Sequence, residues 1–242
     1  MHTWFDRAGL GLFIHWDHAS QQGLEISWPM VGGGGILPHA QNVTPEQYHS
    51  SAATFDPQAW DPVALARLAR SVGVQYAVLT TKHHNGFSMW HTKLSDHSVE
   101  HVPYGRDIVR EFADAMRAEG IKVGFYFSLC DWHHPDYPAF TMEHRPYALG
   151  VSPPMPDDET WARFIEFMFG QLRELLTDYG KVDLVWFDGG WERRRSQWRS
   201  TELEAMMREL QPGLLINDRL PGVGDYATPE QFVPPTPPEG KW

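Results

Sequence analysis

The sequence predicts an α/β fold with parallel strands, either an open sheet or a (β/α)8 TIM-type barrel that is incomplete. Three observations support this fold class. Short apolar segments typical of buried strands alternate along the chain with amphipathic helical segments. A glycine stands between each helical segment and the strand that follows it. Polar residues capable of chemistry follow every strand, as they do at the carboxyl ends of barrel strands.

Five strands are expected. The clearest is the near-continuous apolar run at residues 182–187, which is typical of a parallel strand buried on both faces. Asp188 follows this run directly, and Gly189 and Gly190 then allow a sharp turn. The other four strands are expected at residues 10–16, 74–80, 121–128 and 214–217.

The first of four expected helices begins with Asp61 as its N-cap and Pro62 in its first turn, and Gly73 ends it. Its spacing predicts one apolar face, made of Leu65, Leu68, Ala69 and Val72. Because this helix lies between two expected strands, it forms the first crossover of the sheet.

The other three helices follow the same arrangement. Asp107 caps the second helix, which Gly120 ends. The third has apolar residues at i, i+3 and i+4 over residues 161–176. Thr201 and Glu204 form a capping box for the fourth. We therefore expect parallel strands joined by right-handed crossovers.

The length of the chain bears on whether the barrel closes. A closed barrel typically takes about 250 residues. Here the irregular segment at residues 17–60 and a proline-rich loop before the third helix take up much of the 242 residues. After Arg219 the chain becomes extended and proline-rich. Two architectures follow: an open sheet, or a single catalytic barrel domain over residues 1–242 that lacks its last strands.

Composition limits the classes of partner. The chain has 20 Lys plus Arg against 31 Asp plus Glu, a formal net charge of −11, which argues against nucleic acid or an anionic membrane. No apolar run is long enough to span a bilayer. The amino-terminal residues do not form a signal peptide, so a cytoplasmic location is the default expectation. The single cysteine excludes an internal disulfide.

The ends of the five strands carry the candidate functional residues. On a parallel sheet these ends meet at one edge. Neutral imidazole and amide groups suit the hydroxyl groups of a sugar, and indole rings suit its C–H faces. The residues are His15 with Trp16, His83 with His84 and Asn85, the cluster of Asp131, Trp132, His133 and His134, then Asp188, and finally Asn217 with Arg219.

Hydrolysis of a sugar normally requires two carboxyl groups. Asp188 is the first candidate, and Glu230, in the loop after the last strand, can reach back over the same edge. The alternatives are that Asp188 only caps the following turn and that Glu230 is an ordinary surface residue.

A metal site is a rival use of the same histidines. His15, His83, His84, His133, His134 and Asp188 are the types of residue that bind zinc in barrel hydrolases. However, the sequence has no H-x-H or HExxH spacing. Adjacent residues of an extended chain also point to opposite faces, so His83 and His84 cannot both be ligands unless the chain bends. The sequence therefore predicts no metal site.

At these residues the sequence resembles the α-L-fucosidases of glycoside hydrolase family 29. The resemblance covers nearly the whole chain in the order of the family. Its motifs are Phe13-Ile14-His15-Trp16, Lys82-His83-His84-Asn85-Gly86-Phe87, Tyr104-Gly105-Arg106-Asp107, Trp186-Phe187-Asp188-Gly189-Gly190, and Asn217-Asp218-Arg219 followed by Thr228-Pro229-Glu230.

The resemblance implies a retaining hydrolysis of α-L-fucosides in two steps and without a cofactor. It implies that Asp188 is the nucleophile and Glu230 the general acid and base. It implies that Arg219 organises the acid/base side of the site. The remaining residues expected to contact the substrate are His15, Trp28, His83, His84 and Trp132.

Three features depart from the family pattern. Ser27 precedes Trp28 where many members have a glutamate, and Glu25 lies two residues before Ser27. Tyr126 is followed by Phe127 where a second tyrosine is usual. Family catalytic domains also continue with further barrel strands beyond the point reached here.

Three functions remain open. The first is an α-L-fucosidase acting on a fucosylated oligosaccharide or glycoconjugate. The second is a sugar-binding remnant of the same fold without activity. The third is a metal-dependent hydrolase. The sequence leaves open whether copies of the chain form a homo-oligomer.

Overall fold

The computed structural model describes residues 4–32, 43–138, 154–230, 233 and 235–236. Its centre is one five-stranded parallel sheet in the order β1-β2-β3-β4-β5, so each strand pairs with its neighbours in sequence. The strands are β1 (Gly11–Ile14), β2 (Tyr76–Lys82), β3 (Lys122–Ser128), β4 (Leu184–Asp188) and β5 (Leu215–Ile216). All five predicted strands are therefore confirmed.

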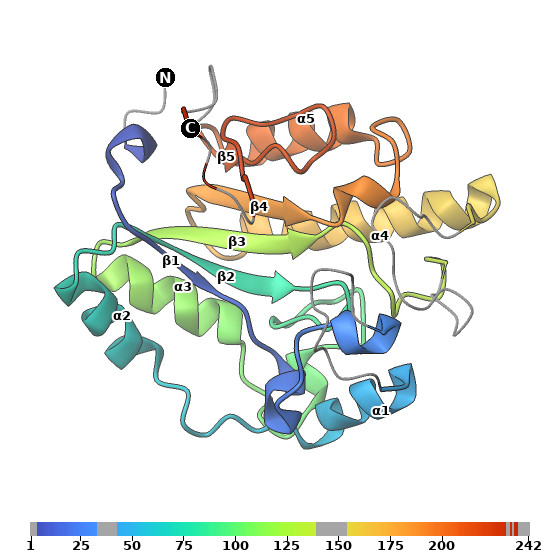
Figure 1. Cartoon of the computed structure of the whole chain (residues 1–242), viewed down its shortest axis with the longest axis horizontal. Helices are drawn as coiled ribbons and strands as arrows, with labels where there is room; N and C mark the ends of the chain where they lie inside the picture. Colours follow the sequence, from blue (N-terminus) through green and yellow to red (C-terminus); the bar gives the residue numbers. More distant parts are fainter. Residues whose placement is uncertain (1–3, 33–42, 139–153, 231–232, 234, 237–242) are drawn as a thin grey trace.

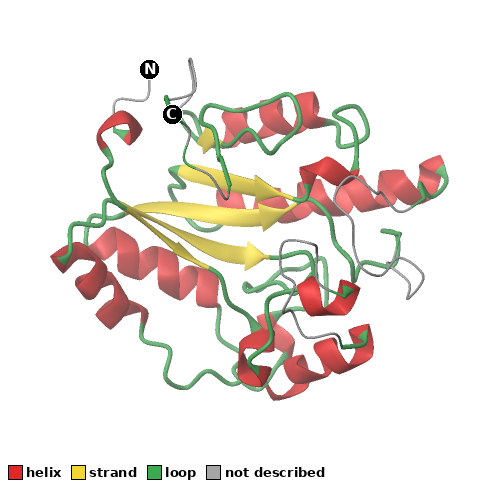
Figure 2. Cartoon of the chain, in the orientation of Figure 1, coloured by secondary structure: helices red, strands yellow, loops and turns green. Residues whose placement is uncertain are grey.

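The main helices pack on one face of the sheet, and all strands point toward the same side of the molecule (Figures 1 and 2). The predicted helices are α2 (Pro62–Ser71), α3 (Ile108–Ala118), α4 (Asp158–Thr177) and α5 (Ser200–Leu210). The glycines after these helices all have positive φ angles, as their expected role requires; they are Gly73, Gly120, Gly180 and Gly213.

The caps predicted for α2 and α3 are present. The Asp61 carboxylate accepts a hydrogen bond from the Ala64 N–H at 2.9 Å, and the Asp107 carboxylate accepts one from the Arg110 N–H at 2.8 Å. The capping box predicted for α5 is wrong. Arg199 occupies the N-cap without a side-chain bond, because the helix begins one residue before Thr201.

The apolar face predicted for α2 is only partly correct. Leu68 and Val72 are 62 % and 60 % exposed, whereas the small residues Ala66 and Ala69 are buried. The alanines of α2 face the core, where small side chains allow the helix to pack closely. Leu68 and Val72 face the solvent. Hydrophobic spacing alone could not distinguish these two orientations.

The segment at residues 17–60 contains elements that the sequence analysis missed. These are the 3-10 helices η2 (His18–Gln22), η3 (Trp28–Val31) and η4 (Ser51–Thr54), and the helix α1 (Pro45–Ser50). A capping box of Thr44 and Gln47 begins α1, so a local signal was present. These elements lie beside the carboxyl ends of the strands (Figure 1).

The main core fills the space between the sheet and the helices. The other face of the sheet carries a smaller apolar cluster of Val78, Tyr126, Leu184, Leu215 and Tyr226. Phe5 of η1 (Phe5–Arg7) packs on Tyr226 with ring centroids 5.0 Å apart, and so connects the region before β1 with the region after β5. No helix of the described residues is long and apolar enough to cross a membrane.

Candidate functional site

The candidate site lies where the strands end. Parallel register places Tyr126 opposite Trp186 and Ser128 opposite Asp188. Side chains two residues apart on a strand share a face, so Tyr126 and Ser128 lie on the same face as Asp188. The residues after β1 and β2 reach the same edge: the ring centroids of His15 and His83 lie 4.7 Å and 5.3 Å from that of Tyr126. The pattern of strand ends thus predicted the position of this site.

Asp188 is buried and held by two donors. The Tyr126 hydroxyl donates to its Oδ2 at 2.9 Å, and Arg219 Nη1 donates to its Oδ1 at 2.9 Å. Burial raises the pKa of Asp188, while the charge of Arg219 and the two hydrogen bonds oppose this rise. The guanidinium and the hydrogen bonds therefore favour the carboxylate form that burial disfavours.

Arg219 connects both candidate carboxylates. Its Nη2 donates to Glu230 Oε2 at 2.6 Å while its Nη1 holds Asp188. The Thr228 hydroxyl accepts from Arg219 Nε at 3.1 Å, and the guanidinium lies 4.6 Å from the Trp186 ring centroid. Glu230 is largely exposed, so its carboxylate faces the open side of the site.

The expectation that His83 and His84 point to opposite faces is wrong. Their ring centroids lie 4.1 Å apart. The register shifts between Thr80 and Lys82, which marks a β-bulge, and β2 ends at Lys82. The chain then turns, so the rule of alternation no longer applies.

Hydrogen bonds fix the proton position on His84. The Ser128 hydroxyl donates its only hydrogen to the Cys130 carbonyl at 2.6 Å, so it must accept from His84 Nδ1 at 2.7 Å. The lone pair is then on Nε2, which lies 3.9 Å from Asp188 Oδ2. Burial lowers the pKa of His84 to about 3, so the ring is neutral.

Ser27 binds the neighbouring ring of His83. Ser27 Oγ accepts from the Asn85 N–H at 2.9 Å and lies at hydrogen-bond distance, 2.7 Å, from His83 Nδ1. This bond orients the ring and leaves Nε2 of His83 as its second polar atom. Burial lowers the pKa of His83 well below its usual value.

His15 and two tryptophans complete the surroundings. The His15 ring packs 4.7 Å from Tyr126, and burial lowers its pKa to about 4, although part of the residue is exposed. Trp132 lies 4.9 Å from the His84 ring and Trp28 lies 5.4 Å from it. The two indoles form the apolar walls beside the histidines.

Several residues at the strand ends do not join this group. Asp131 accepts from Lys82 Nζ at 3.1 Å and caps its own turn. His134 packs on Phe167 at 4.2 Å. The Asn85 amide donates to Asp17 and Tyr48. The Asn217 amide binds the backbone of Phe187. The Trp16 ring packs on Phe55 and Trp60.

Sequence reasoning missed other residues of the site. The register and the period of two identify Tyr126 and Ser128 once Asp188 is chosen, so that signal was available. Trp191 lies 5.8 Å from the His84 ring, and the buried Glu192 accepts from Trp132 Nε1 at 3.1 Å. These two follow a tight turn at Gly189, and no sequence period extends through it.

The same residues have the geometry to hold a cation. Ligand atoms of His83, His84 and Asp188 lie within 4.8 Å of one another. However, Nδ1 of His83 is engaged with the Ser27 hydroxyl, and Arg219 already neutralises Asp188. The arrangement therefore suits a hydroxyl ligand, which can donate to Nε2 of His84.

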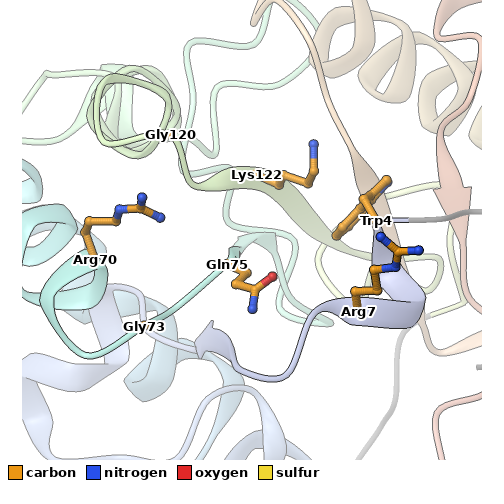
Figure 3. Close-up of a pocket in the computed structure, with 7 residues that line it drawn as sticks. All are labelled: Trp4, Arg7, Arg70, Gly73, Gln75, Gly120 and Lys122. Atoms are coloured by element: carbon orange, nitrogen blue, oxygen red, sulfur yellow. The ribbon is translucent and has the colours of Figure 1, made fainter.

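A second depression lies at the opposite end of the strands. It has a volume of about 590 Å³ and is lined by Trp4, Arg7, Arg70, Gly73, Gln75, Gly120 and Lys122. Figure 3 shows their side chains around the amino ends of β2 and β3. It shares no residue with the candidate site.

Comparison with known proteins gives consistent matches. The family model described as Alpha-L-fucosidase matches residues 1–242. The tissue alpha-L-fucosidase of Macaca fascicularis is 33 % identical over an alignment of 260 positions that covers 99 % of this chain and 52 % of that protein. The human protein of the same name is 32 % identical, with the same coverage. The chain thus spans about half the length of these relatives.

Solved structures agree. Alpha-L-fucosidase isoenzyme 1 of Paenibacillus thiaminolyticus is 40 % identical with a TM-score of 0.81, covering 99 % of this chain and 58 % of that one. A GH29 alpha-L-fucosidase of Bacteroides thetaiotaomicron, trapped as a covalent intermediate with 2-fluoro-fucosyl fluoride, is 33 % identical with a TM-score of 0.75. That match covers 93 % of this chain and 50 % of the other.

Proposed function

The chain belongs to the alpha-L-fucosidase family, and from this premise we propose that it is an exo-acting retaining glycosidase that releases L-fucose from α-L-fucosides. The observation that carries the proposal is the pair of carboxylates on one guanidinium. Asp188 is buried and held at 2.9 Å from Arg219, while Glu230 is exposed and binds the same side chain. One carboxylate is thus fixed inside the site and the other stands at its opening, as the two roles of the mechanism require.

In the first step Asp188 attacks the anomeric carbon of the fucoside. The bond from that carbon to the glycosidic oxygen breaks, and Glu230 in its protonated form gives its proton to the leaving oxygen. A fucosyl ester of Asp188 results. Before the attack, Arg219 donates a hydrogen bond to Oδ1 of Asp188, and the Tyr126 hydroxyl donates one to its Oδ2.

In the second step Glu230, now a carboxylate, takes a proton from water while the water oxygen attacks the anomeric carbon. The ester bond breaks, fucose leaves with the original configuration, and Asp188 is again a free carboxylate. No cofactor is needed, because the protons and electrons balance between water, substrate and these two residues.

The histidines would hold the sugar hydroxyls. His84 offers a lone pair to which one hydroxyl can donate, and His83 lies beside it as a second hydrogen-bonding partner. His15 lies 5.7 Å from the His83 ring and extends this polar wall. Trp28 and Trp132 would pack against the C–H faces of the ring.

We also propose that residues 1–242 form one catalytic domain and that its sheet is part of a (β/α)8 barrel. Strands that pair strictly in sequence order support this, because doubly wound sheets reverse their order at a switch point. Helices around the outside of the sheet (Figure 2) also fit a barrel wall.

Turnover of a chromogenic α-L-fucoside tests the proposal. The purified chain should release the chromophore, Asp188→Ala should lose at least about 10³-fold in kcat, as removal of a nucleophile usually does, and EDTA should have no effect. Asp136→Ala, which removes an acid outside the site, is the matched control. Binding of fucose without turnover by the folded chain would instead identify a sugar-binding remnant. Turnover that EDTA abolishes in the unmodified chain and in His49→Gln alike would identify the metal-dependent hydrolase, because His49 belongs to a separate group of histidines.

A further inference from the structure

A second cluster of histidines lies outside the candidate sugar site. His18 begins η2, His49 lies in α1, and His97 lies in the loop between β2 and η5 (Val99–His101). One ring nitrogen of each lies within 4.8 Å of those of the other two. The three segments are distant in sequence, and the sequence analysis singled out none of these residues.

Each of the three rings has a buried nitrogen without a hydrogen-bond partner among the described residues. These atoms are Nε2 of His18, Nδ1 of His49 and Nε2 of His97. Buried polar atoms normally have partners, because leaving one unsatisfied is costly. Three such atoms in one cluster point to a missing ligand that would satisfy all of them together.

The hydrogen bonds of His18 show that its free nitrogen carries a lone pair. The Ser51 hydroxyl donates to the Tyr48 carbonyl at 3.0 Å, so it accepts from His18 Nδ1 at 2.5 Å. The other nitrogen, Nε2, is then an acceptor. A hydrogen bond that fixes the tautomer in this way is typical of histidines that bind metals.

The other two rings are neutral as well. Burial lowers the pKa of His18. It lowers the pKa of His49 to about 3 and the pKa of His97 well below its usual value. Neighbouring histidines lower the pKa of His49 and of His97 further. Neutral imidazoles have a lone pair to offer at neutral pH. His133 is exposed, stacks on His97 at 3.9 Å and contacts His49 at 4.9 Å, so the cluster lies close to solvent on that side.

We propose that His18, His49 and His97 form a binding site for a divalent cation of the zinc class. Three imidazole nitrogens suit Zn²⁺, Co²⁺ and Ni²⁺. Tetrahedral zinc holds its nitrogens roughly 3.3 Å apart, which the rings reach by moving inward about 1 Å. Water or His133 would take the fourth position.

The bound ion would join three segments beside the sugar site. His97 is hydrogen-bonded to the backbone of Asn85, which directly follows His83 and His84. The ion would therefore fix the loop after β2 against η2 and α1. This role is structural and does not depend on the fucosidase proposal.

Calorimetric titration of the metal-stripped chain with ZnCl₂ tests the site. We expect one equivalent to bind, with at least a 100-fold loss of affinity in His49→Gln and in His97→Gln. The control His101→Gln, an exposed histidine outside the cluster, should bind as the unmodified chain does. Asp188→Ala should also bind normally, because it alters only the other group of potential ligands.

Cobalt provides a second readout that needs no variant. One equivalent of Co²⁺ should give the strong visible bands of four-coordinate cobalt in the unmodified chain, and Zn²⁺ should displace it. Absence of saturable binding would overturn the proposal. Loss of binding in Asp188→Ala with retention in His49→Gln would also overturn it, since the ion would then lie in the sugar site.

Discussion

Arg219 determines the state of the candidate nucleophile. Asp188 is buried, which favours its protonated form, and the guanidinium at 2.9 Å favours the carboxylate. The same side chain binds Glu230 at 2.6 Å, which keeps that residue beside the site although it is exposed. One arginine therefore controls both the charge of the first carboxylate and the position of the second.

Replacing this arginine should change the pH dependence of the reaction. In Arg219→Ala the pKa of Asp188 rises, because the positive charge that favours its carboxylate is removed. The acidic limb of kcat/KM against pH should therefore move to higher pH, by at least about one unit. Arg193→Ala, outside the carboxylate pair, should leave the limb in place. An unchanged limb in Arg219→Ala would contradict the role given to the guanidinium.

Ser27 is a strained residue next to the site. Its φ is 63°, which is uncommon for a residue with a side chain, and its hydroxyl and backbone bind His83, Asn85 and Tyr48. Such strain persists only where surrounding contacts hold it. We infer that the strain is tolerated because Ser27 orients His83.

Loss of the Ser27 hydroxyl should weaken the hold on the sugar. We predict that Ser27→Ala lowers kcat/KM about tenfold, the effect of one hydrogen bond, because the His83 ring loses the partner of its Nδ1. Steady-state kinetics on the chromogenic fucoside measure this. Ser71→Ala, an exposed serine at the end of α2, serves as the control. Equal rates for both variants would show that Ser27 does not act through His83.

The β-bulge in β2 places Lys82, which forms a buried ion pair, directly before His83, which belongs to the candidate site. Lys82 pairs with Phe127 after the shift, and its ammonium is buried against Asp131 at 3.1 Å and Gln171 at 2.9 Å. Burial lowers the pKa of Lys82, and its partner Asp131 opposes this. His83, the next residue, faces Tyr126 instead. The bulge thus directs the Lys82 side chain toward α4 and the His83 side chain toward the candidate site.

Breaking this ion pair should unfold the chain more readily. Lys82→Met leaves Asp131 as an uncompensated buried charge, so we predict a loss of about 3–5 kcal/mol in the free energy of unfolding. Urea denaturation measures it. The exposed pair of Arg163 and Asp136 gives the comparison, since Arg163→Met should cost less than about 1 kcal/mol. Similar losses in both variants would contradict this account.

At this scale, sequence predicted the elements whose signals are local. Aspartate caps, glycines after helices and apolar runs identified five strands and four helices. The small helix α1 was missed because it lies in an irregular segment. Leu68 was predicted to face the core, but the buried positions of α2 are taken by alanines. The orientation of α2 depends on contacts between distant segments, which a single sequence does not contain, whereas α1 had a local signal in its capping box of Thr44 and Gln47.

For the whole molecule, strand order made the position of the site predictable. Five parallel strands in sequence order bring Asp188 and His84 to one edge although 104 positions separate them. The turn at His84, the hydroxyl partners of both histidines, and the second histidine cluster were not predictable. Each results from loops folding against one another after the strands end.

Burial of many neutral histidines makes stability depend on pH. The folded pKa values of His49 and His84 are about 3, below the value of about 6.5 in the unfolded chain. Their contribution to stability is complete above about pH 6.5 and declines as the pH falls, by up to about 1.4 kcal/mol per pH unit each. Urea denaturation of the metal-free chain at pH 7 and pH 5 should show this decline. A smaller decline is expected for His49→Gln, and equal stability at both pH values would be inconsistent with buried neutral histidines.

The most direct test of the central claim is to trap the covalent intermediate. The chain should be incubated with 2-fluoro-fucosyl fluoride, analysed by intact mass spectrometry, and digested to locate the modified residue. The mechanism predicts a single fluorofucosyl ester on Asp188 in the unmodified chain and no adduct in Asp188→Ala. Modification of any other residue, or release of fluoride without an adduct on Asp188, would contradict the assignment of Asp188 as the nucleophile.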